Sequence, residues 1–306
     1  MVTDSHVDVE VAAADDDNTS LEQAVTVFES VRPRLFGIAY RMLGSAAEAE
    51  DLVQEVWLRW QTCDRGKVAN PAAFLATAMT RLAINELQSA RVRRETYVGP
   101  WLPEPVDTSA DPYLGAERGE ALEFAALVLM EKLTPNERAA YILREAFGYS
   151  YAEIANIVQS TEPAVRQLVS RARKHVTGER RTPVPAEAQR ELLTKFLAAA
   201  RTGEMGALEK LFAADVTSLS DGNGRHQIAR RAVVGASWVA KFLAAMSWFW
   251  EGVETEFATM NGQPCVVLMA GGSVYGLLAI EASADGIDQL FWMLNPEKNA
   301  QVPAPA

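Results

Sequence analysis

The spacing of the apolar residues changes along this chain, and that change most limits what the chain can fold into. Between residues 21 and 176, apolar residues recur at intervals of three and four, which is typical of helices with one buried face. From residue 216 onwards they form short runs separated by turn residues, as β-strands do. This order predicts helical domains followed by an α+β domain. A chain of 306 residues has room for two or three domains.

Charge, proline and glycine mark where the domains should begin and end. Residues 1–22 contain seven acidic residues and no lysine or arginine, which predicts a disordered start to the chain. Clusters of proline and glycine predict two linkers. The expected segments are a disordered acidic tail (1–20), a helical domain (21–95), a linker (96–120), a second helical domain (121–177), a second linker (178–188), an α+β domain (189–298) and a disordered tail (299–306).

The net charge of −11 hides an uneven distribution. Residues 161–181 contain six basic residues, Arg180 and Arg181 among them, against two acidic ones. Clustered basic residues mark surfaces that bind nucleic acid better than the overall charge does. The sequence therefore predicts a nucleic-acid contact near residue 170 in spite of its acidic total.

The composition gives no reason to expect a metal, a disulfide or a membrane span. The two cysteines, Cys63 and Cys265, lie far apart without the spacing of zinc ligands, so we expect no metal site, no disulfide and no cofactor. Such a composition suits a reducing cytoplasm. The chain has no run of 18 apolar residues, and its acidic N-terminus lacks the order of a secretory signal.

Residues 151–174 have the pattern of a helix-turn-helix. Gln159 and Ser160 form the expected turn, and Thr161 is a good N-cap for the second helix. That helix has an apolar stripe opposite a face rich in donors, which suits base reading and phosphate binding. A solvated amphipathic helix would show the same pattern. The candidate DNA contacts are Thr161, Arg166, Gln167, Ser170, Arg171, Arg173 and Lys174.

The first helical block carries a more specific pattern, Asp51-Leu52-Val53-Gln54-Glu55-Val56. Together with the helix-turn-helix, it resembles regions 2 and 4 of the extracytoplasmic-function RNA polymerase sigma factors. The resemblance implies an alternative sigma factor that binds core RNA polymerase and starts transcription at promoter DNA. Region 2 would dock on the clamp helices of the largest polymerase subunit, and region 4 on the flap of the second. The implied polymerase contacts are Asp51, Leu52, Gln54, Glu55 and Trp57.

The resemblance also assigns the two promoter elements. Residues 71–94 would melt the promoter and hold unpaired bases of the −10 element, for which pockets with arginine and asparagine donors are suited. The helix-turn-helix would read the −35 element as a duplex. The candidate −10 contacts are Asn70, Thr80, Arg81, Asn85, Arg91, Arg93 and Arg94.

Three motifs extend the resemblance to members that carry a C-terminal SnoaL-like, nuclear transport factor 2-like domain. They are Trp101-Leu102-Pro103-Glu104-Pro105, Asp221-Gly222-Asn223-Gly224-Arg225 and Asn295-Pro296-Glu297-Lys298. The second departs from the usual Asp-Gly-Gly-Gly-Lys/Arg at Asn223, which can still adopt a positive φ. The resemblance implies a cone-shaped α+β domain that regulates the factor. We expect the first two motifs to share one interdomain surface.

The cone of such a domain can hold a small-molecule ligand, and some relatives are enzymes. Catalysis would need an acid or base inside the cone. The available groups form no convincing constellation, and we predict no catalytic residue; they are Asp221, His226, Glu254, Glu256 and Asp288. The aromatic residues of the domain should form its core; they are Trp248, Phe249, Trp250, Phe291 and Trp292.

Two other interpretations remain open at this point. A one-component helix-turn-helix regulator with a ligand-binding C-terminal domain explains residues 121–306 but not the pattern at 51–60. An enzyme with a vestigial DNA-binding half leaves residues 21–176 unexplained. A phosphate-binding loop is set aside, because Gly222-Asn223-Gly224 lacks the flanking strand, helix and spacing.

Overall fold

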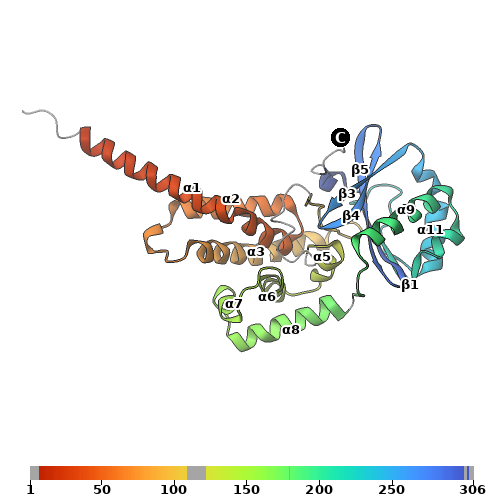
Figure 1. Cartoon of the computed structure of the whole chain (residues 1–306), viewed down its shortest axis with the longest axis horizontal. Coiled ribbons are helices and arrows are strands. Elements are labelled where there is room, and N and C mark those ends of the chain that lie inside the picture. Colours follow the sequence, from red (N-terminus) through yellow and green to blue (C-terminus); the bar gives the residue numbers. More distant parts are fainter. Residues whose placement is uncertain (1–6, 109–121, 179, 300–301, 303–306) are drawn as a thin grey trace, which may run out of the picture.

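The computed structural model describes residues 7–108, 122–178, 180–299 and 302. Figure 1 shows an elongated molecule with a helical body at one end and a sheet covered by helices at the other. Within the described residues, no helix is long and apolar enough to cross a membrane. The expected change from helices to an α+β domain is confirmed.

The first part of the helical body contains three long helices and one short turn of 3₁₀-helix. Gly44, at φ 68°, ends the first helix, and the Ser45 side chain caps the second by accepting from the Glu48 amide at 3.2 Å. Asn70 caps the third, with Pro71 at its first position. The elements are α1 (Val7–Leu43), α2 (Ala46–Thr62), η1 (Arg65–Lys67) and α3 (Pro71–Glu95).

The second part of the helical body contains the helix-turn-helix. Two of its helices start with a capping box. Thr134 and Glu137 form the box before the helix at Pro135, and Ser150 and Glu153 form the box before the helix at Tyr151. Gln159 adopts φ 53° in the turn, and Thr161 caps the recognition helix at the Ala164 amide. The elements are α5 (Phe124–Met130), α6 (Pro135–Glu145), α7 (Tyr151–Ile157) and α8 (Glu162–Gly178).

One continuous apolar core joins these two parts. Leu35 and Met79 belong to the same cluster as Ile142 and Ile154. At the seam, Arg138 is fully buried; its Nε donates to the Arg41 carbonyl oxygen at 3.0 Å. The two expected helical domains are therefore packed against each other.

The C-terminal domain is a six-stranded sheet in the order β2-β1-β6-β5-β4-β3. β1 pairs parallel with β6, and the other pairs are antiparallel, so the expected meander is present from β3 to β6. The helices are α9 (Ala186–Thr202), α10 (Met205–Glu209), α11 (Ala236–Ala245), the 3₁₀-helix η3 (Ser247–Trp250) and α12 (Pro296–Asn299). The strands are β1 (Phe212–Asp221), β2 (Val233–Val234), β3 (Val253–Met260), β4 (Gln263–Ala270), β5 (Ser273–Ser283) and β6 (Gly286–Met293).

The two faces of this sheet bury different parts of the chain. One face packs with α9 and α11 around Phe196, Leu243 and Trp292. The other face, with Phe291, packs on Leu102 of the linker and Phe124 of α5. The linker and the start of the second helical part therefore belong to the core of the C-terminal domain.

The two ends of the chain differ from their expected disorder where the structure describes them. Residues 7–20 continue α1, since a run rich in alanine, valine and acidic residues has few helix breakers. Near the C-terminus, Asn299 and Val302 are buried, because they pack under the last strands. The described residues leave out all of the expected linker after residue 108. They exclude residues 1–6, 109–121, 179, 300–301 and 303–306.

Candidate interdomain junction and nucleic-acid surfaces

A buried aspartate at the end of β1 forms the centre of an interdomain junction. Asp221 is 0% exposed, yet three donors satisfy its carboxylate. The Leu102 amide donates at 2.9 Å and the Lys298 ammonium at 2.7 Å, and the Tyr97 hydroxyl donates as well. A buried charge is tolerated only when paired and hydrogen-bonded, as this one is. The linker motif and the turn motif thus meet at one buried surface in this structure.

Lys298 brings the third motif into the same junction. Its ammonium also donates to the Leu102 carbonyl oxygen and lies 4.1 Å from the Trp101 ring centroid. Burial lowers the pKa of Lys298, while Asp221 opposes that change. Burial, followed by the hydrogen bond to Asp221, raises the pKa of Tyr97 above its usual value. Asn295 donates to the Tyr97 hydroxyl oxygen at 3.0 Å, so all three motifs meet here.

The linker motif extends the junction to the first helical part. The Arg94 guanidinium stacks 3.5 Å from the Trp101 centroid, and a Cβ atom at Gly44 would lie 2.7 Å from that ring. The Glu104 carboxylate accepts from the Ser45 hydroxyl at 2.9 Å and from the Ala46 amide at 2.7 Å. A carboxylate at the start of α2 accepts hydrogen bonds from amides that have no partner within the helix. Its negative charge also interacts favourably with the positive end of the helix dipole.

Asn261 forms a second contact that the sequence reasoning missed. It is fully buried at the β3–β4 turn; its amide donates to the Tyr40 hydroxyl at 2.6 Å and to the Leu122 carbonyl at 3.0 Å. Its side-chain oxygen accepts from the Val106 amide at 2.9 Å. Asn261-Gly262 is a hairpin-turn signal, which predicts the turn but not these long-range partners.

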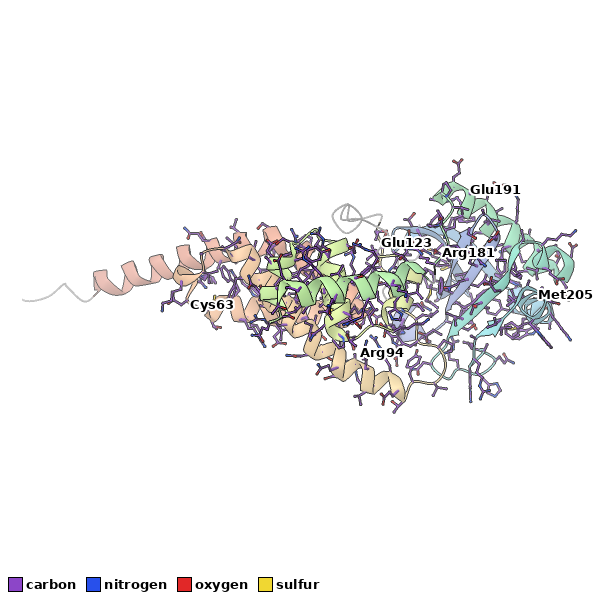
Figure 2. The ribbon with its side chains drawn as sticks, turned by 90° about the horizontal axis from the view of Figure 1, so that it is seen from below. Cys63, Arg94, Glu123, Arg181, Glu191 and Met205 are labelled. Atoms are coloured by element: carbon purple, nitrogen blue, oxygen red, sulfur yellow. The ribbon has the colours of Figure 1, made fainter. Side chains whose placement is uncertain are left out.

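Two arginines after α8 connect the helix-turn-helix to the C-terminal domain. Arg180 pairs with Glu281 at 2.7 Å and with Glu123, and Arg181 pairs with Asp288 and, at 2.8 Å, with Asp215. Figure 2 places Glu123 and Arg181 where the helical body meets the sheet. These two arginines contributed to the predicted nucleic-acid cluster, but here acidic partners occupy them.

Most of the candidate −10 residues contact other parts of the protein. Arg81 donates to the carbonyls of Ile157 at 3.0 Å and Asn156 at 3.1 Å, next to the turn of the helix-turn-helix. The remaining arginines bind protein partners: Arg91 binds the Leu133 carbonyl, Arg93 binds Glu48 and Glu86, and Arg94 binds Glu131 and the Leu43 carbonyl.

The other candidates of this set differ in exposure. Asn85 is exposed, and Asn70 is exposed as the N-cap of α3. Thr80 is 0% exposed, and its hydroxyl donates to the Ala76 carbonyl at 2.8 Å. Thr80 is therefore a core residue in this structure, because the helical period places it on the buried face of α3.

The candidate −35 residues lie on the exposed face of α8. All seven are exposed, while Val165, Val169 and Ala172 are buried on the opposite side. Arg166 also lies 4.4 Å from the Tyr151 ring. Arg171 and Arg173 pair with Glu137 and Glu145 of α6. These pairs are solvent-accessible, and exposed pairs of this kind are easily exchanged for phosphate contacts.

The candidate polymerase residues occupy both faces of α2. Asp51 and Gln54 are exposed, and Glu55 pairs with Arg59 at 2.5 Å. Leu52 is buried, while Trp57 is half-buried and its ring lies 5.0 Å from that of Phe28. The exposed face of α2 is thus polar and acidic, and the opposite face is apolar and buried.

The groups considered for catalysis do not converge. Glu254 and Glu256 are exposed on β3, Asp288 pairs with Arg181, and Asp221 is held in the junction. Of the five, His226 lines a pocket in the C-terminal domain. Among the described residues, no cluster of three or more metal-ligating side chains is found.

The aromatic residues expected in the core divide into two groups. Phe291 and Trp292 are buried. Trp248 is 46% exposed, and it lines the same pocket as Phe249 and Trp250. The expectation that all five are core residues is wrong for Trp248, because η3 lies at the edge of the apolar core. Phe249 and Trp250 are half-buried and pack against that core.

The comparisons with known proteins agree with these arrangements. Residues 27–93 match the model of Sigma-70 region 2, and residues 124–176 match that of Sigma-70 region 4. The chain is 41% identical over 227 residues to the ECF RNA polymerase sigma factor SigJ of Mycobacterium tuberculosis, covering 72% of each chain. It is 28% identical to the probable ECF sigma factor SigI of the same species, covering 87% of this chain and 91% of the relative.

A solved structure supports the architecture. The crystal structure of M. tuberculosis extracytoplasmic function sigma factor SigJ superposes with a TM-score of 0.73 at 33% identity, covering 92% of this chain and 100% of that one. The match to region 2 favours an initiation factor over the one-component regulator, which leaves that region unexplained. Sigma factors as a family bind RNA polymerase and promoter DNA and are not enzymes. The chain belongs to the extracytoplasmic-function RNA polymerase sigma factors and acts as an alternative sigma factor.

Proposed function

We propose that the C-terminal domain regulates this sigma factor by holding regions 2 and 4 in a closed arrangement that must open on a promoter. The observation that carries the proposal is the buried pair of Asp221 and Lys298, which binds both backbone groups of Leu102 in the linker between the two regions. The same linker caps α2 of region 2 through Glu104. Arg180 holds the end of region 4 to the same domain.

The closed arrangement keeps the two DNA-reading units too close for a promoter. The −10 and −35 elements are separated by about 25 base pairs, or roughly 85 Å of duplex at about 3.4 Å per base pair. Here Arg81 of α3 donates directly to backbone carbonyls at the end of α7. Units in direct contact cannot occupy both elements at once, so promoter binding requires regions 2 and 4 to separate.

Opening would also release the residues assigned to the −10 element. Arg81 and Arg91 now bind carbonyls of region 4, and Arg94 binds Glu131 there. After separation these guanidinium groups can bind phosphates and unpaired bases. Asn70 and Asn85 are exposed already. The exposed face of α8 would read the −35 element through Arg166 and Gln167, with the phosphates held by its other basic residues.

The proposed polymerase surface is accessible before opening. Asp51 and Gln54 lie exposed on α2. Figure 1 shows α2 on the side of the helical body away from α8. We assign this face to the clamp helices of the largest polymerase subunit, and region 4 to the flap of the second. Docking of region 2 can then come first, followed by separation of region 4.

Run-off transcription with purified core polymerase and a pool of genomic promoter fragments tests this function. Asp51→Ala/Gln54→Ala should fail to bind core polymerase. Trp101→Ala should change transcript yield by weakening the junction, whereas Trp238→Ala, on the exposed side of α11, should match the wild type. Equal yields from the Trp101 and Trp238 variants would reject the regulatory role of the junction. Normal core binding by the double variant would reject the α2 assignment.

A further inference from the structure

The longest stretch of the chain without an acidic residue lies in the C-terminal domain. Residues 222–250 contain three arginines, one lysine and one histidine and no aspartate or glutamate, in a chain with 40 acidic residues and a net charge of −11. The three arginines and the histidine fall within residues 225–231, in the loop between β1 and β2. Concentrated positive charge on an acidic protein indicates a surface for an anionic partner.

Arg230 and Arg231, at the end of this loop, have free donors. Both residues are exposed, and neither has a hydrogen bond or an ion pair within the part of the chain that the structure describes. By contrast, carboxylates hold the exposed guanidinium groups of Arg93, Arg171 and Arg173. A guanidinium group presents its N–H donors in a geometry that fits a phosphate. The loop can therefore bind phosphate without breaking a contact within the protein.

Contacts on its inner side hold the loop in place. The Arg225 guanidinium donates to the Leu294 carbonyl at 2.9 Å. Ile228 packs against the apolar core of the domain, and a Cβ atom at Gly222 would lie 2.5 Å from its side chain. Because Gly222 admits Ile228 so closely, the loop folds back on the domain and presents Arg230 and Arg231 at a defined place.

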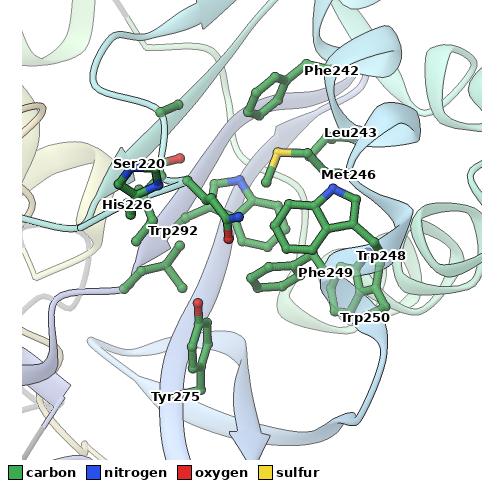
Figure 3. Close-up of a pocket in the computed structure, with 14 residues that line it drawn as sticks. Ser220, His226, Phe242, Leu243, Met246, Trp248, Phe249, Trp250, Tyr275 and Trp292 are labelled. Carbon is green, nitrogen blue, oxygen red and sulfur yellow. The ribbon is translucent and has the colours of Figure 1, made fainter. Parts of the chain in front are cut away.

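The pocket beside the loop does not account for this charge. Its volume is about 50 Å³, and none of the three arginines lines it. Of the loop's charged or titratable residues, His226 lines the pocket; Figure 3 shows it on the Ser220 side, across from Trp248. Arg230 and Arg231 belong to the outer surface of the molecule instead.

The loop lies against the linker segment that directly follows α3. A Cβ atom at Gly99 would lie 3.7 Å from the Arg230 Cα atom, and one at Gly224 would lie 3.4 Å from the Val98 side chain. The exposed acidic residues of the flanking elements, Glu95 at the end of α3 and Glu297 in α12, pair with neither Arg230 nor Arg231 in the described chain. The loop therefore extends the basic end of α3.

This position is close to the bases that α3 is expected to hold. Asn85 lies ten residues before the end of α3 at Glu95, which is about 15 Å along a helix. The four residues from there to Gly99 span at most about 14 Å. The loop thus lies within roughly 30 Å of Asn85, which corresponds to fewer than about ten base pairs of duplex at about 3.4 Å each.

We propose that the loop of residues 225–231 is a DNA-binding surface, in which Arg230 and Arg231 bind phosphates of the promoter duplex within one helical turn of the −10 element. The proposal goes beyond the closed arrangement, since it gives the C-terminal domain a direct contact with DNA, and it rests on the assignment of the −10 element to α3. Such contacts fix position and add affinity without reading bases. The contact persists when region 4 separates, because the buried Asp221 junction keeps the domain on region 2.

The salt dependence of DNA binding tests the phosphate contacts. Holoenzyme reconstituted with core polymerase is titrated onto one promoter fragment from the run-off pool at several salt concentrations. The slope of log K against log salt should be smaller by about two for Arg230→Gln/Arg231→Gln than for the wild type. Equal slopes overturn the proposal, and weaker core binding by that variant would then assign the loop to polymerase.

Lys195→Gln/Lys210→Gln is the matched control, because it removes the same charge elsewhere on the domain. Both lysines are exposed and line a groove with Gly206 of α10. Figure 2 shows Met205, the first residue of α10, at the end of the domain away from the helical body. This variant should keep the wild-type slope. An equal decrease in both variants would show a general effect of charge and overturn the proposed contact.

An iron chelate tethered at Arg231→Cys locates the contact on the same fragment. A Cys63→Ser background leaves Cys265, which is buried, as the other cysteine. The chelate should cut the duplex within about ten base pairs of the −10 element, whose position follows from the start of the run-off transcript. Lys210→Cys in the same background should leave that stretch uncut. Absence of cutting there from Arg231→Cys overturns the proposal.

The assignment of the −10 element to α3 is judged separately by Asn85→Ala. This variant should relax the preference for the −10 bases and keep the salt slope, because it removes a base contact and no charge. An unchanged base preference, together with a reduced slope in the arginine variant, would reject that assignment and leave the DNA contact of the loop standing.

Discussion

The C-terminal domain holds region 2 and region 4 by two contacts of opposite character. On the region 2 side, Asp221 and Lys298 are 0% and 7% exposed and bind the backbone of Leu102, in the linker that caps α2 through Glu104. On the region 4 side, Arg181 is 39% exposed and pairs directly with the carboxylates of Asp215, Asp285 and Asp288. Added salt weakens ion pairs between solvent-exposed charges and weakens buried pairs much less. We therefore expect the closed arrangement to open first on the region 4 side.

Breaking the buried Asp221–Lys298 pair should have the largest effect on the stability of the protein. Lys298→Met leaves the Asp221 carboxylate buried without its cation, which costs about 3–5 kcal/mol when one partner of a buried pair is removed. Urea unfolding of the full chain measures the loss. The double variant Asp221→Asn/Lys298→Met should recover most of it, because no buried charge remains. A double variant as unstable as the single one would show that packing, not charge, holds this contact.

Gly44 tests the fit of the linker against region 2. Gly44→Ala should cost about 2–3 kcal/mol, from the positive φ and from the contact of the new Cβ with Trp101, which Arg94 already confines. Gly148→Ala is the control, with φ 72° and nothing within 4 Å of its Cβ. It should cost about 1–2 kcal/mol for the backbone alone. Equal costs in urea unfolding would contradict a tight Trp101 contact.

Arg180 belongs to the less exposed part of the region 4 contact. The stability lost when Arg180 is replaced should depend on pH. Burial raises the pKa of Glu281, and Arg180 opposes that rise. A carboxyl group with a raised folded-state pKa binds its proton more tightly when folded, so stability falls as the pH rises through that pKa. Removing Arg180 raises the pKa further and extends the loss to higher pH. We expect Arg180→Gln to cost about 2 kcal/mol at neutral pH and clearly less at about pH 5.

The pH dependence has a direct control. The reference is the single variant Glu281→Gln. Neither it nor Arg180→Gln/Glu281→Gln contains the buried carboxyl group, so the unfolding free energy lost on removing Arg180 in this background should be the same at both pH values. A pH-independent loss in the single variant Arg180→Gln would show that Glu281 stays ionised without its partner.

Replacing Arg181 should have the smallest effect on the closed arrangement, and added salt should abolish that effect. At low ionic strength, Arg181→Gln should expand the molecule slightly by small-angle scattering, because region 4 loses partners on the sheet domain. In about 0.5 M salt, wild type and variant should have the same radius of gyration, since the exposed pairs are screened. A difference that persists in high salt would place Arg181 with the buried contact instead.

Features set by neighbouring residues were predictable from the sequence. The Thr134 capping box, the apolar stripe of α8 and the central part of each long strand depend on spacings of two to four residues, and all are present. The three motifs that resemble signatures of the family also marked residues of the junction. The two-residue strand β2 and the pocket role of Trp248 had no local signal.

The sequence by itself determined the succession of helices and strands, the donor face of α8 and the family, because periodicity and motif spacing act over short stretches. Only the tertiary structure decided which charges pair and which surfaces close. Leu102 meets Asp221 across 119 positions, and Asn261 meets Tyr40 across 221. Such partners are selected by burial, where each donor and acceptor must be satisfied once the sheet packs on the linker. No local pattern records that requirement.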